Sequence, residues 1–287
     1  MTIYRLKFTI LVFISLCLFE CIYPQSVSGD SSFHPYHVNY WVTGSICGVG
    51  LVTNLLGISH TLNKEDISLF EIQALNRESI SGIDYLALKQ EPSKADTYLN
   101  YSDYVLTFSV ATPVLLMLDK RISKDWYNIL LMYMETLSIT TNFYEWGFLG
   151  PTFQDRFRPI TYYDQLTYDQ KKSGYNRNSF YSGHTATAAV STFFMVKVYC
   201  DYNPEVGDNK YLLYTAAAIP PLMVGFFRVK AMRHFPSDVM VGLGVGALFG
   251  IIVPEFHRLQ DKNISLRLYS TSEATGIAIN WQPDFLK

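Results

Sequence analysis

The segment RVKAMRHFPSDVMVGLGVGALFGIIV runs from Arg228 to Val253 and joins a charged stretch to a long apolar one. Pro236 suits the first turn of a helix, and Asp238 lies just inside that turn. His234 therefore lies at the helix entrance, four residues before Asp238. This spacing predicts that the carboxylate reaches the imidazole, holds its tautomer and leaves the second ring nitrogen free to act as a nucleophile.

The apolar stretch after Asp238 is the last of six such blocks, which are residues 38–59, 104–118, 126–140, 182–199, 211–227 and 239–253. Each block approaches the roughly 20 residues that a helix needs to cross a bilayer. Pro220-Pro221 would kink the fifth block, which membrane helices tolerate better than soluble ones. We therefore predict an all-α fold, a six-helix transmembrane bundle, over a soluble helical core.

The composition agrees with a membrane fold, because 49% of the 287 residues are hydrophobic and only 17% are charged. This composition argues against a disordered chain. The 23 Lys and Arg are balanced by 25 Asp and Glu, which argues against a nucleic-acid-binding protein because such a protein would be basic. Mean hydropathy is only +0.09, so polar segments must dilute the apolar blocks. The four cysteines lack the spacing of a metal site or a disulfide framework.

Three segments flank or interrupt the predicted bundle, which we assign to residues 36–256. Residues 1–28 combine basic residues, an apolar run and small residues, a pattern typical of a signal peptide or an N-terminal anchor. Residues 61–101 predict short amphipathic helices on a surface. In residues 257–287, alternating apolar residues on both sides of a turn-like stretch predict a short C-terminal β-hairpin tail.

Two further motifs lie at the ends of apolar blocks, namely residues 156–159 (Arg-Phe-Arg-Pro) and residues 182–184 (Ser-Gly-His). If the blocks alternate across a bilayer, one side carries the end of the third block, the start of the fourth, the end of the fifth and the start of the sixth. Both motifs then lie on the same side as the charged residues of the segment 228–238. We therefore expect the three motifs to converge.

Together the three motifs predict a phosphate site. Arg158 and Arg228 provide planar, permanently charged groups that match phosphate oxygens. Ser182 suits the cap of a helix whose first N–H groups attract an anion, and Gly183 lets the anion approach the backbone. Two histidines, His184 and His234, allow one nucleophile and one general acid. No ligand cluster indicates a metal, and the cations can themselves hold the developing charge.

Arg-Pro, Ser-Gly-His and Arg-x5-His-x3-Asp, in this order within residues 38–256, resemble the type 2 phosphatidic acid phosphatase family. That family shares its core with the vanadium haloperoxidases and the bacterial non-specific acid phosphatases. The resemblance implies that His234 forms a phosphohistidine, that Asp238 is its partner and that His184 protonates the leaving group. It also implies hydrolysis without a metal or other cofactor. The phosphate-binding residues that it implies are Arg158, Ser182, Gly183 and Arg228.

The sequence departs from the family pattern at three positions. Pro151 stands where the first motif has a phosphate-contacting lysine, seven residues before its arginine. Tyr181 replaces a proline before the second motif, and Phe227 replaces a frequent serine before the third. The missing lysine is the departure that bears most on activity, because that lysine normally contacts phosphate.

A replacement cation is available in the same region. We expect Arg156 to bind phosphate in place of the missing lysine, with Lys171 or Lys172 as alternatives. The predicted function is a membrane-bound, metal-independent lipid phosphatase. The alternatives are a catalytically impaired phospholipid-binding membrane protein and a vanadate-dependent haloperoxidase, which the membrane-like composition disfavours.

Sidedness follows from residues 120–124, which carry three cations between two apolar blocks. The positive-inside rule places this loop in the cytoplasm, so the motifs face the extracytoplasmic or periplasmic side of the cell (inner) membrane. A full crossing by residues 38–59 would conflict with a cleaved signal peptide, and the sequence leaves this point open. The expected partners are a lipid phosphate or pyrophosphate and the bilayer, without nucleic acid or an obligate protein partner.

Overall fold

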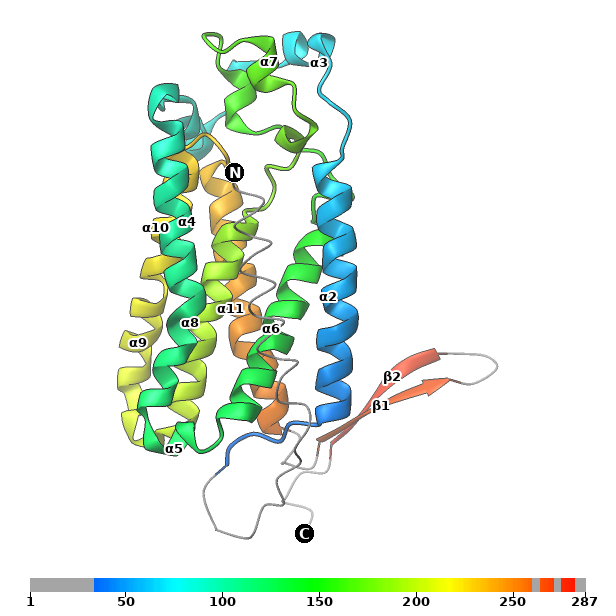
Figure 1. Cartoon of the computed structure of the whole chain (residues 1–287), viewed down its shortest axis with the longest axis vertical. Coiled ribbons are helices and arrows are strands. Elements are labelled where there is room, and N and C mark those ends of the chain that lie inside the picture. Colours follow the sequence, from blue (N-terminus) through cyan, green and yellow to red (C-terminus); the bar gives the residue numbers. More distant parts are fainter. Residues whose placement is uncertain (1–33, 260–263, 271–274, 282–287) are drawn as a thin grey trace. The chain divides into compact units, whose positions relative to one another are not determined.

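The computed structural model describes residues 34–259, 264–270 and 275–281, in which helices predominate (Figure 1). The predicted signal peptide or anchor, residues 1–28, lies outside the described residues. The α-helices are α2 (Tyr40–Leu62), α3 (Leu69–Ala74), α4 (Ala95–Ala111), α5 (Lys120–Ser123), α6 (Trp126–Trp146), α7 (Tyr168–Lys171), α8 (Gly183–Tyr202), α9 (Lys210–Ala217), α10 (Ile219–Lys230) and α11 (Pro236–Leu259). The 3-10 helices are η1 (Arg77–Ser79), η2 (Gly82–Leu88), η3 (Pro92–Lys94), η4 (Thr112–Leu118), η5 (Pro159–Tyr162), η6 (Gly174–Arg177) and η7 (Pro204–Asn209). The strands are β1 (Ile264–Ser270) and β2 (Thr275–Trp281), which pair antiparallel.

Among the residues that the structure describes, four helical stretches are long and apolar enough to cross a bilayer, and they are Tyr40–Leu62, Pro92–Leu118, Pro204–Lys230 and Pro236–Arg258. The second joins α4 to η4, and the third joins α9 to α10 next to Pro220-Pro221. The chain is therefore an integral membrane protein with a predominantly α-helical fold. The predicted helical membrane fold is confirmed, with four of the six predicted crossings supported by length and hydropathy.

α6 and α8 are 21 and 20 residues long but do not reach the apolar character of these four stretches. α8 is surrounded by α11, α10, α4 and α6 (Figure 1). It buries the polar side chains of Thr185, Ser191 and Lys197 inside the protein. A helix enclosed by other helices needs no continuous apolar surface towards lipid, which explains its lower hydropathy.

The close packing of α8 against α11 depends on glycines spaced four residues apart on α11. A Cβ atom at Gly242 would lie 2.5 Å from the carbonyl oxygen of Ser182, and one at Gly246 would lie 2.2 Å from that of Ala186. Small residues at this spacing let membrane helices approach closely. This approach also brings the second and third motifs together, because the Ser182 N–H donates to the Asp238 carbonyl at 3.0 Å.

We expect Gly246→Ala to destabilise the protein by about 1–3 kcal/mol, because the added methyl group would overpack the contact between α8 and α11. Gly244→Ala is the matched control, since a Cβ there meets no atom within 4 Å. Thermal unfolding in detergent, followed by circular dichroism, should show a lower Tm for Gly246→Ala only. Equal Tm values for the two variants would contradict this packing.

α2 extends from the end of the bundle near α5 to the end that carries the motifs (Figure 1). At its start, the Tyr40 hydroxyl donates to Asn128 Oδ1 at 2.8 Å, next to the beginning of α6. At its end, Asn178 Nδ2 donates to the Thr61 carbonyl at 2.8 Å, next to the beginning of α8. The start of α2 therefore lies at the end of the bundle opposite the motifs.

The segment between α2 and α4 forms the short helices α3, η1, η2 and η3, as the sequence predicts. It packs onto the long loop between α6 and α8, where the Ile67 N–H donates to the Lys172 carbonyl at 2.6 Å. Leu88 of η2 joins a buried cluster with Met232 and Phe235 of the third motif. The segment thus covers the motif end of the bundle, and its contact with a membrane surface stays a prediction.

Candidate active site

The three motifs meet at one end of the bundle, as the sequence predicts. The Ser179 N–H donates to the Arg156 carbonyl at 2.9 Å, which joins the first motif to the second. The bond from the Ser182 N–H to the Asp238 carbonyl joins the second motif to the third. Main-chain hydrogen bonds therefore set the relative positions of the three motifs before any side chain is considered.

His234 lies 1% exposed in the turn between α10 and α11. Met232, with a left-handed φ of 57°, reverses the chain just before it. Nδ1 of His234 lies 2.6 Å from the Ser179 carbonyl oxygen. Because a carbonyl only accepts, Nδ1 carries the proton and Nε2 keeps its lone pair. Burial, followed by the positive charges of Arg158 and Arg228, holds the pKa of His234 well below its ordinary value, so the imidazole is neutral at pH 7.

Arg158 and Arg228 are buried and keep unpaired N–H groups. Nη2 of Arg158 donates to the Asn178 carbonyl at 3.0 Å, but its Nε and Nη1 have no partner among the described residues. Nε of Arg228 also lacks a partner in this part of the chain. Buried charged donors without acceptors are costly, so these groups indicate a site for an anion.

Arg233, five residues after Arg228, adds a third positive charge. Its side chain is half-buried next to His234, and burial together with the charges of Arg158 and Arg228 lowers its pKa to about 10. The guanidinium of Arg158 lies 4.0 Å from the ring centroid of Tyr175, and its charge lowers the pKa of that phenol to about 8. Both shifts indicate a strongly positive potential around His234.

The start of α8 is arranged as the second motif predicts. Ser182 caps the helix, and its Oγ accepts from the Thr185 N–H at 3.4 Å. Gly183 packs against an aromatic ring, because a Cβ there would lie 3.0 Å from Cζ of Tyr144. The positive end of the α8 helix dipole therefore lies at the second motif.

His184 lies in the first turn of α8, close to a carboxylate that the motifs do not contain. Its Nε2 is 3.8 Å from Oδ1 of Asp103, a residue of α4. The same oxygen is 3.9 Å from Nη1 of Arg228. The structure thus brings His184 and Arg228 together around Asp103, whose only sequence signal is a charge directly before an apolar block.

Asp238 is close to His234, as the spacing predicts, but it does not hold the tautomer of the imidazole directly. Its Oδ2 lies 3.9 Å from Nδ1 of His234, which exceeds hydrogen-bond distance. The same oxygen accepts from Ser179 Oγ at 2.7 Å and from the Phe235 N–H at 2.8 Å. The carbonyl of Ser179 accepts the Nδ1 proton instead, so Ser179 connects the carboxylate to the imidazole.

Residues 126–262 match the family model described as the PAP2 superfamily. This part of the chain belongs to the PAP2 superfamily. Over 82 residues the chain is 34% identical to phosphatidylglycerophosphatase B of Bacillus subtilis (strain 168), and the aligned part covers 27% of this chain and 38% of that protein. A comparison of structures finds the crystal structure of the first transmembrane PAP2 type phosphatidylglycerolphosphate phosphatase from Bacillus subtilis. That match has a TM-score of 0.41 and 19% sequence identity, and it covers 75% of this chain and 94% of the other.

Within the PAP2 domain, the side chain of Arg156 lies against two carboxylates. Its Nη2 donates to Oδ2 of Asp84 at 2.7 Å, and its Nη1 donates to Oδ1 of Asp238. Both ends of the guanidinium are therefore occupied by anionic partners. Arg156, the expected replacement for the missing lysine, is thus paired with two carboxylates, and its role in binding phosphate stays a prediction. The sequence could not show that Asp84 folds onto it.

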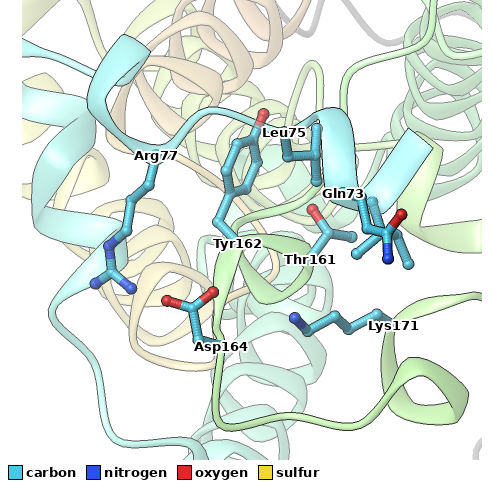
Figure 2. A pocket seen from close by; sticks show the side chains of 8 residues that line it. Gln73, Leu75, Arg77, Thr161, Tyr162, Asp164 and Lys171 are labelled. Atoms are coloured by element: carbon cyan, nitrogen blue, oxygen red, sulfur yellow. The ribbon is translucent and has the colours of Figure 1, made fainter. Parts of the chain in front are cut away.

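The two loop lysines considered as alternatives also have other surroundings. Lys171 lines a cavity of about 270 Å³ together with Arg77 and Asp164 (Figure 2), and burial lowers the pKa of this lysine. Lys172 forms an ion pair with Asp169 at 2.7 Å. Within the described part of the chain, neither lysine forms a hydrogen bond or ion pair with Arg158 or Arg228.

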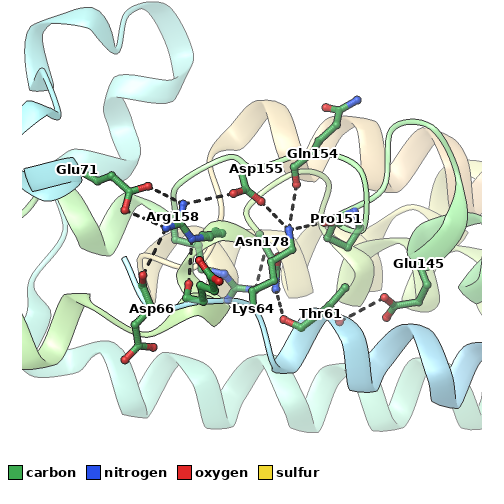
Figure 3. Close-up of polar contacts among 12 residues, drawn as sticks. Thr61, Lys64, Asp66, Glu71, Glu145, Pro151, Gln154, Asp155, Arg158 and Asn178 are labelled. Carbon is green, nitrogen blue, oxygen red and sulfur yellow. Dashed lines mark hydrogen bonds and ion pairs between the residues drawn. The ribbon is translucent and has the colours of Figure 1, made fainter. Parts of the chain in front are cut away.

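Pro151, which stands in the place of the motif lysine, is contacted by a lysine from another element. Lys64, just after α2, donates from Nζ to the carbonyls of Pro151 and Gln154 and to Oδ1 of Asp155 (Figure 3). The bond to Asp155 is an ion pair of 2.7 Å. The ammonium of Lys64 therefore fixes the loop of the PAP2 domain to the end of α2.

Proposed function

We propose that this protein hydrolyses a phosphate monoester or pyrophosphate of a membrane lipid through a phosphohistidine at His234. The observation that carries the proposal is the pair of buried guanidinium groups of Arg158 and Arg228, which keep unpaired N–H groups and whose charges act on the neutral imidazole of His234. Fixed donors of this kind stabilise the charge that develops on phosphate oxygens in the transition state. They also hold the phosphorus atom in reach of Nε2.

In the proposed reaction, Nε2 of His234 attacks phosphorus, and the P–N bond forms as the bond to the leaving-group oxygen breaks. His184 donates a proton to that oxygen. Water then attacks the phosphohistidine while His184 removes a proton from the water, and the P–N bond breaks to release inorganic phosphate. The Ser179 carbonyl keeps the Nδ1 proton in place throughout both steps.

The phosphate-binding groups proposed here are the two buried arginines, the helix start at Ser182 and Gly183, and Arg233. The side chain of Arg233 makes no hydrogen bond or ion pair with the described residues, so its guanidinium remains available for an anion. It directly precedes the proposed nucleophile in the sequence. We assign to Arg233 the charge that the lysine of the first motif would otherwise supply.

A lipid substrate agrees with the location of the site at one end of a membrane-embedded bundle. The relative from Bacillus subtilis is named phosphatidylglycerophosphatase B, which makes phosphatidylglycerophosphate the first lipid to examine. Phosphatidate, polyprenyl pyrophosphate and the phosphates of lipid A remain in the same chemical class.

We also propose that α6 and α8 cross the membrane with the four apolar stretches, because they lie inside the same bundle. Lys120, Arg121 and Lys124 then lie at the end opposite the site. The positive-inside rule places these cations in the cytoplasm and the site on the extracytoplasmic side of the cell membrane. Single cysteines introduced at position 121 or 154 test this orientation. In intact cells, an impermeant thiol reagent should block the cysteine at position 154 and leave the one at position 121 unmodified.

A panel of phosphate esters tests the proposed function. Purified protein in detergent should release inorganic phosphate from at least one lipid phosphate, without added metal, and His234→Ala should not. If no lipid or soluble phosphate is hydrolysed, the protein is not this enzyme, and a role in phospholipid binding takes its place. Halide oxidation that appears only with added vanadate would contradict the phosphatase assignment in favour of a haloperoxidase.

The depressed pKa of His234 predicts the acid limb of the pH profile. A nucleophilic imidazole must be neutral, and activity is lost as the pH falls through the pKa of the free enzyme. Because burial and the neighbouring arginines lower this pKa, kcat/KM should begin to fall only well below pH 6.5. This limb is measured as kcat/KM at a series of pH values, corrected for the ionisation of the substrate phosphate. A midpoint of the fall in kcat/KM at or above pH 6.5 would contradict a neutral, buried His234.

A further inference from the structure

Asp84 of η2 contacts the start of α11 although it lies outside the residues that match the PAP2 model. Its Oδ1 accepts from the Ser237 N–H at 2.9 Å, and its Oδ2 accepts from Ser237 Oγ at 2.7 Å. The same Oδ2 accepts from Nη2 of Arg156. The carboxylate thus satisfies a backbone N–H in the first turn of α11, as a helix cap does. Asp84 therefore fixes the turn that directly follows His234.

Arg156 completes this arrangement from the opposite side. Its Nη1 donates to Ser237 Oγ at 3.0 Å and also to Oδ1 of Asp238, and its guanidinium lies 4.5 Å from the ring centroid of Phe235. The side chain of Asp238 is 0% exposed, so its carboxylate depends on a counter-charge inside the protein. Arg156 supplies that charge.

We propose that Asp84 and Arg156 form a clamp, defined as their ion pair together with its bonds to Ser237 and Asp238, that positions His234 for attack. Arg156 is then a positioning residue and not a phosphate ligand. The inference rests on the proposed phosphatase function for its kinetic consequences only. The contact between Asp84 and Arg156 itself is a property of the fold.

The clamp reaches the nucleophile through a continuous series of contacts. Arg156 holds Oδ1 of Asp238, and Oδ2 of Asp238 accepts from Ser179 Oγ. The carbonyl of Ser179 accepts the Nδ1 proton of His234. A displacement of about 1 Å at a reacting atom can lower a rate about 10²-fold, so loss of the clamp should act on the chemical step.

The kinetic test separates this role from phosphate binding. In Arg156→Lys the charge remains, but a single ammonium cannot bridge two carboxylates as a guanidinium does. We expect Arg156→Lys and Asp84→Asn each to lower kcat by roughly 10- to 100-fold, with KM changed by less than about twofold. The double variant should lose no more than the worse single one, because the two residues act as a unit.

Asp169→Asn is the matched control, since it breaks the exposed ion pair with Lys172 away from the clamp. It should leave both kinetic constants unchanged. A rise in KM of tenfold or more in Arg156→Lys, with kcat unchanged, would make Arg156 a phosphate ligand and overturn the clamp. Unchanged kcat in both Asp84→Asn and Arg156→Lys would overturn it as well.

Hydrogen exchange provides a measurement that needs no catalysis. We expect the backbone amides of Phe235, Ser237, Asp238 and Val239 to exchange at least about tenfold faster in Asp84→Ala than in the wild type, while amides of α8 keep their protection. Unchanged exchange in residues 235–239 overturns the clamp. If α8 also loses protection in Asp84→Ala, that variant is destabilised as a whole. Exchange in residues 235–239 is then compared with exchange in α8 in Asp84→Asn, and this comparison decides. Failure of the wild type to release phosphate rejects the proposed function, whereas the exchange data judge the clamp separately.

Discussion

Replacing His234 with alanine is expected to lower the rate of phosphate release by at least about 10³-fold and to abolish covalent labelling of the protein. The reason is that Nε2 of His234 is the proposed attacking atom, and its geometry is fixed by the Ser179 carbonyl at Nδ1. Initial rates with a hydrolysed lipid, together with an alkaline quench of ³²P-labelled substrate, measure both effects.

His37→Ala is the control, because its N–H donates to the His257 carbonyl at the opposite end of the bundle. This variant should keep its rate and its label. Undiminished phosphate release from His234→Ala, or a ³²P label that persists in it, would show that another group attacks phosphorus.

Replacing His184 with alanine is expected to have an effect that depends on the leaving group. An alkoxide is a poor leaving group and needs a proton from His184, so hydrolysis of a lipid phosphate should fall by about 10²- to 10⁴-fold. The first turnover of p-nitrophenyl phosphate should fall by less than about tenfold, because p-nitrophenolate leaves without protonation.

Rapid-quench measurement of the first turnover isolates bond cleavage from the later hydrolysis of the phosphohistidine, in which His184 has its second role. Arg158→Ala serves for comparison, because loss of a phosphate ligand should slow both substrates alike. An equal defect of His184→Ala on the two substrates would contradict its role as the general acid.

The overall fold was predictable because it depends on local signals. Apolar runs of membrane length located the helices, and Pro220-Pro221 marked the junction between α9 and α10. α6 and α8 were harder to classify, since buried polar residues such as Glu135 and Lys197 lower their hydropathy while neighbouring helices enclose them. The alternation of helices across a bilayer was also sufficient to predict that the three motifs meet.

The candidate site was predictable only where its residues belong to a motif. Asp84 and Asp103 come from segments before the PAP2 domain, and no spacing in the sequence links them to residues more than 70 positions away. The position of Arg156 depended on Asp84 in the same way, so its proximity to Arg158 in the sequence did not show which carboxylates it contacts. Ser179 holds the imidazole through its backbone carbonyl, and a backbone group carries no side-chain signal in the sequence.

The ion pair between Asp84 and Arg156 bears on how this protein can be divided for engineering. Arg156 lies within residues 126–262, whereas Asp84 lies in the connection between two membrane helices that precede them. In a chimera that exchanges residues 126–262 alone, the arginine comes from one parent and the segment that carries Asp84 comes from the other. We conclude that the exchangeable module begins upstream of η2, so that both members of the pair come from the same parent.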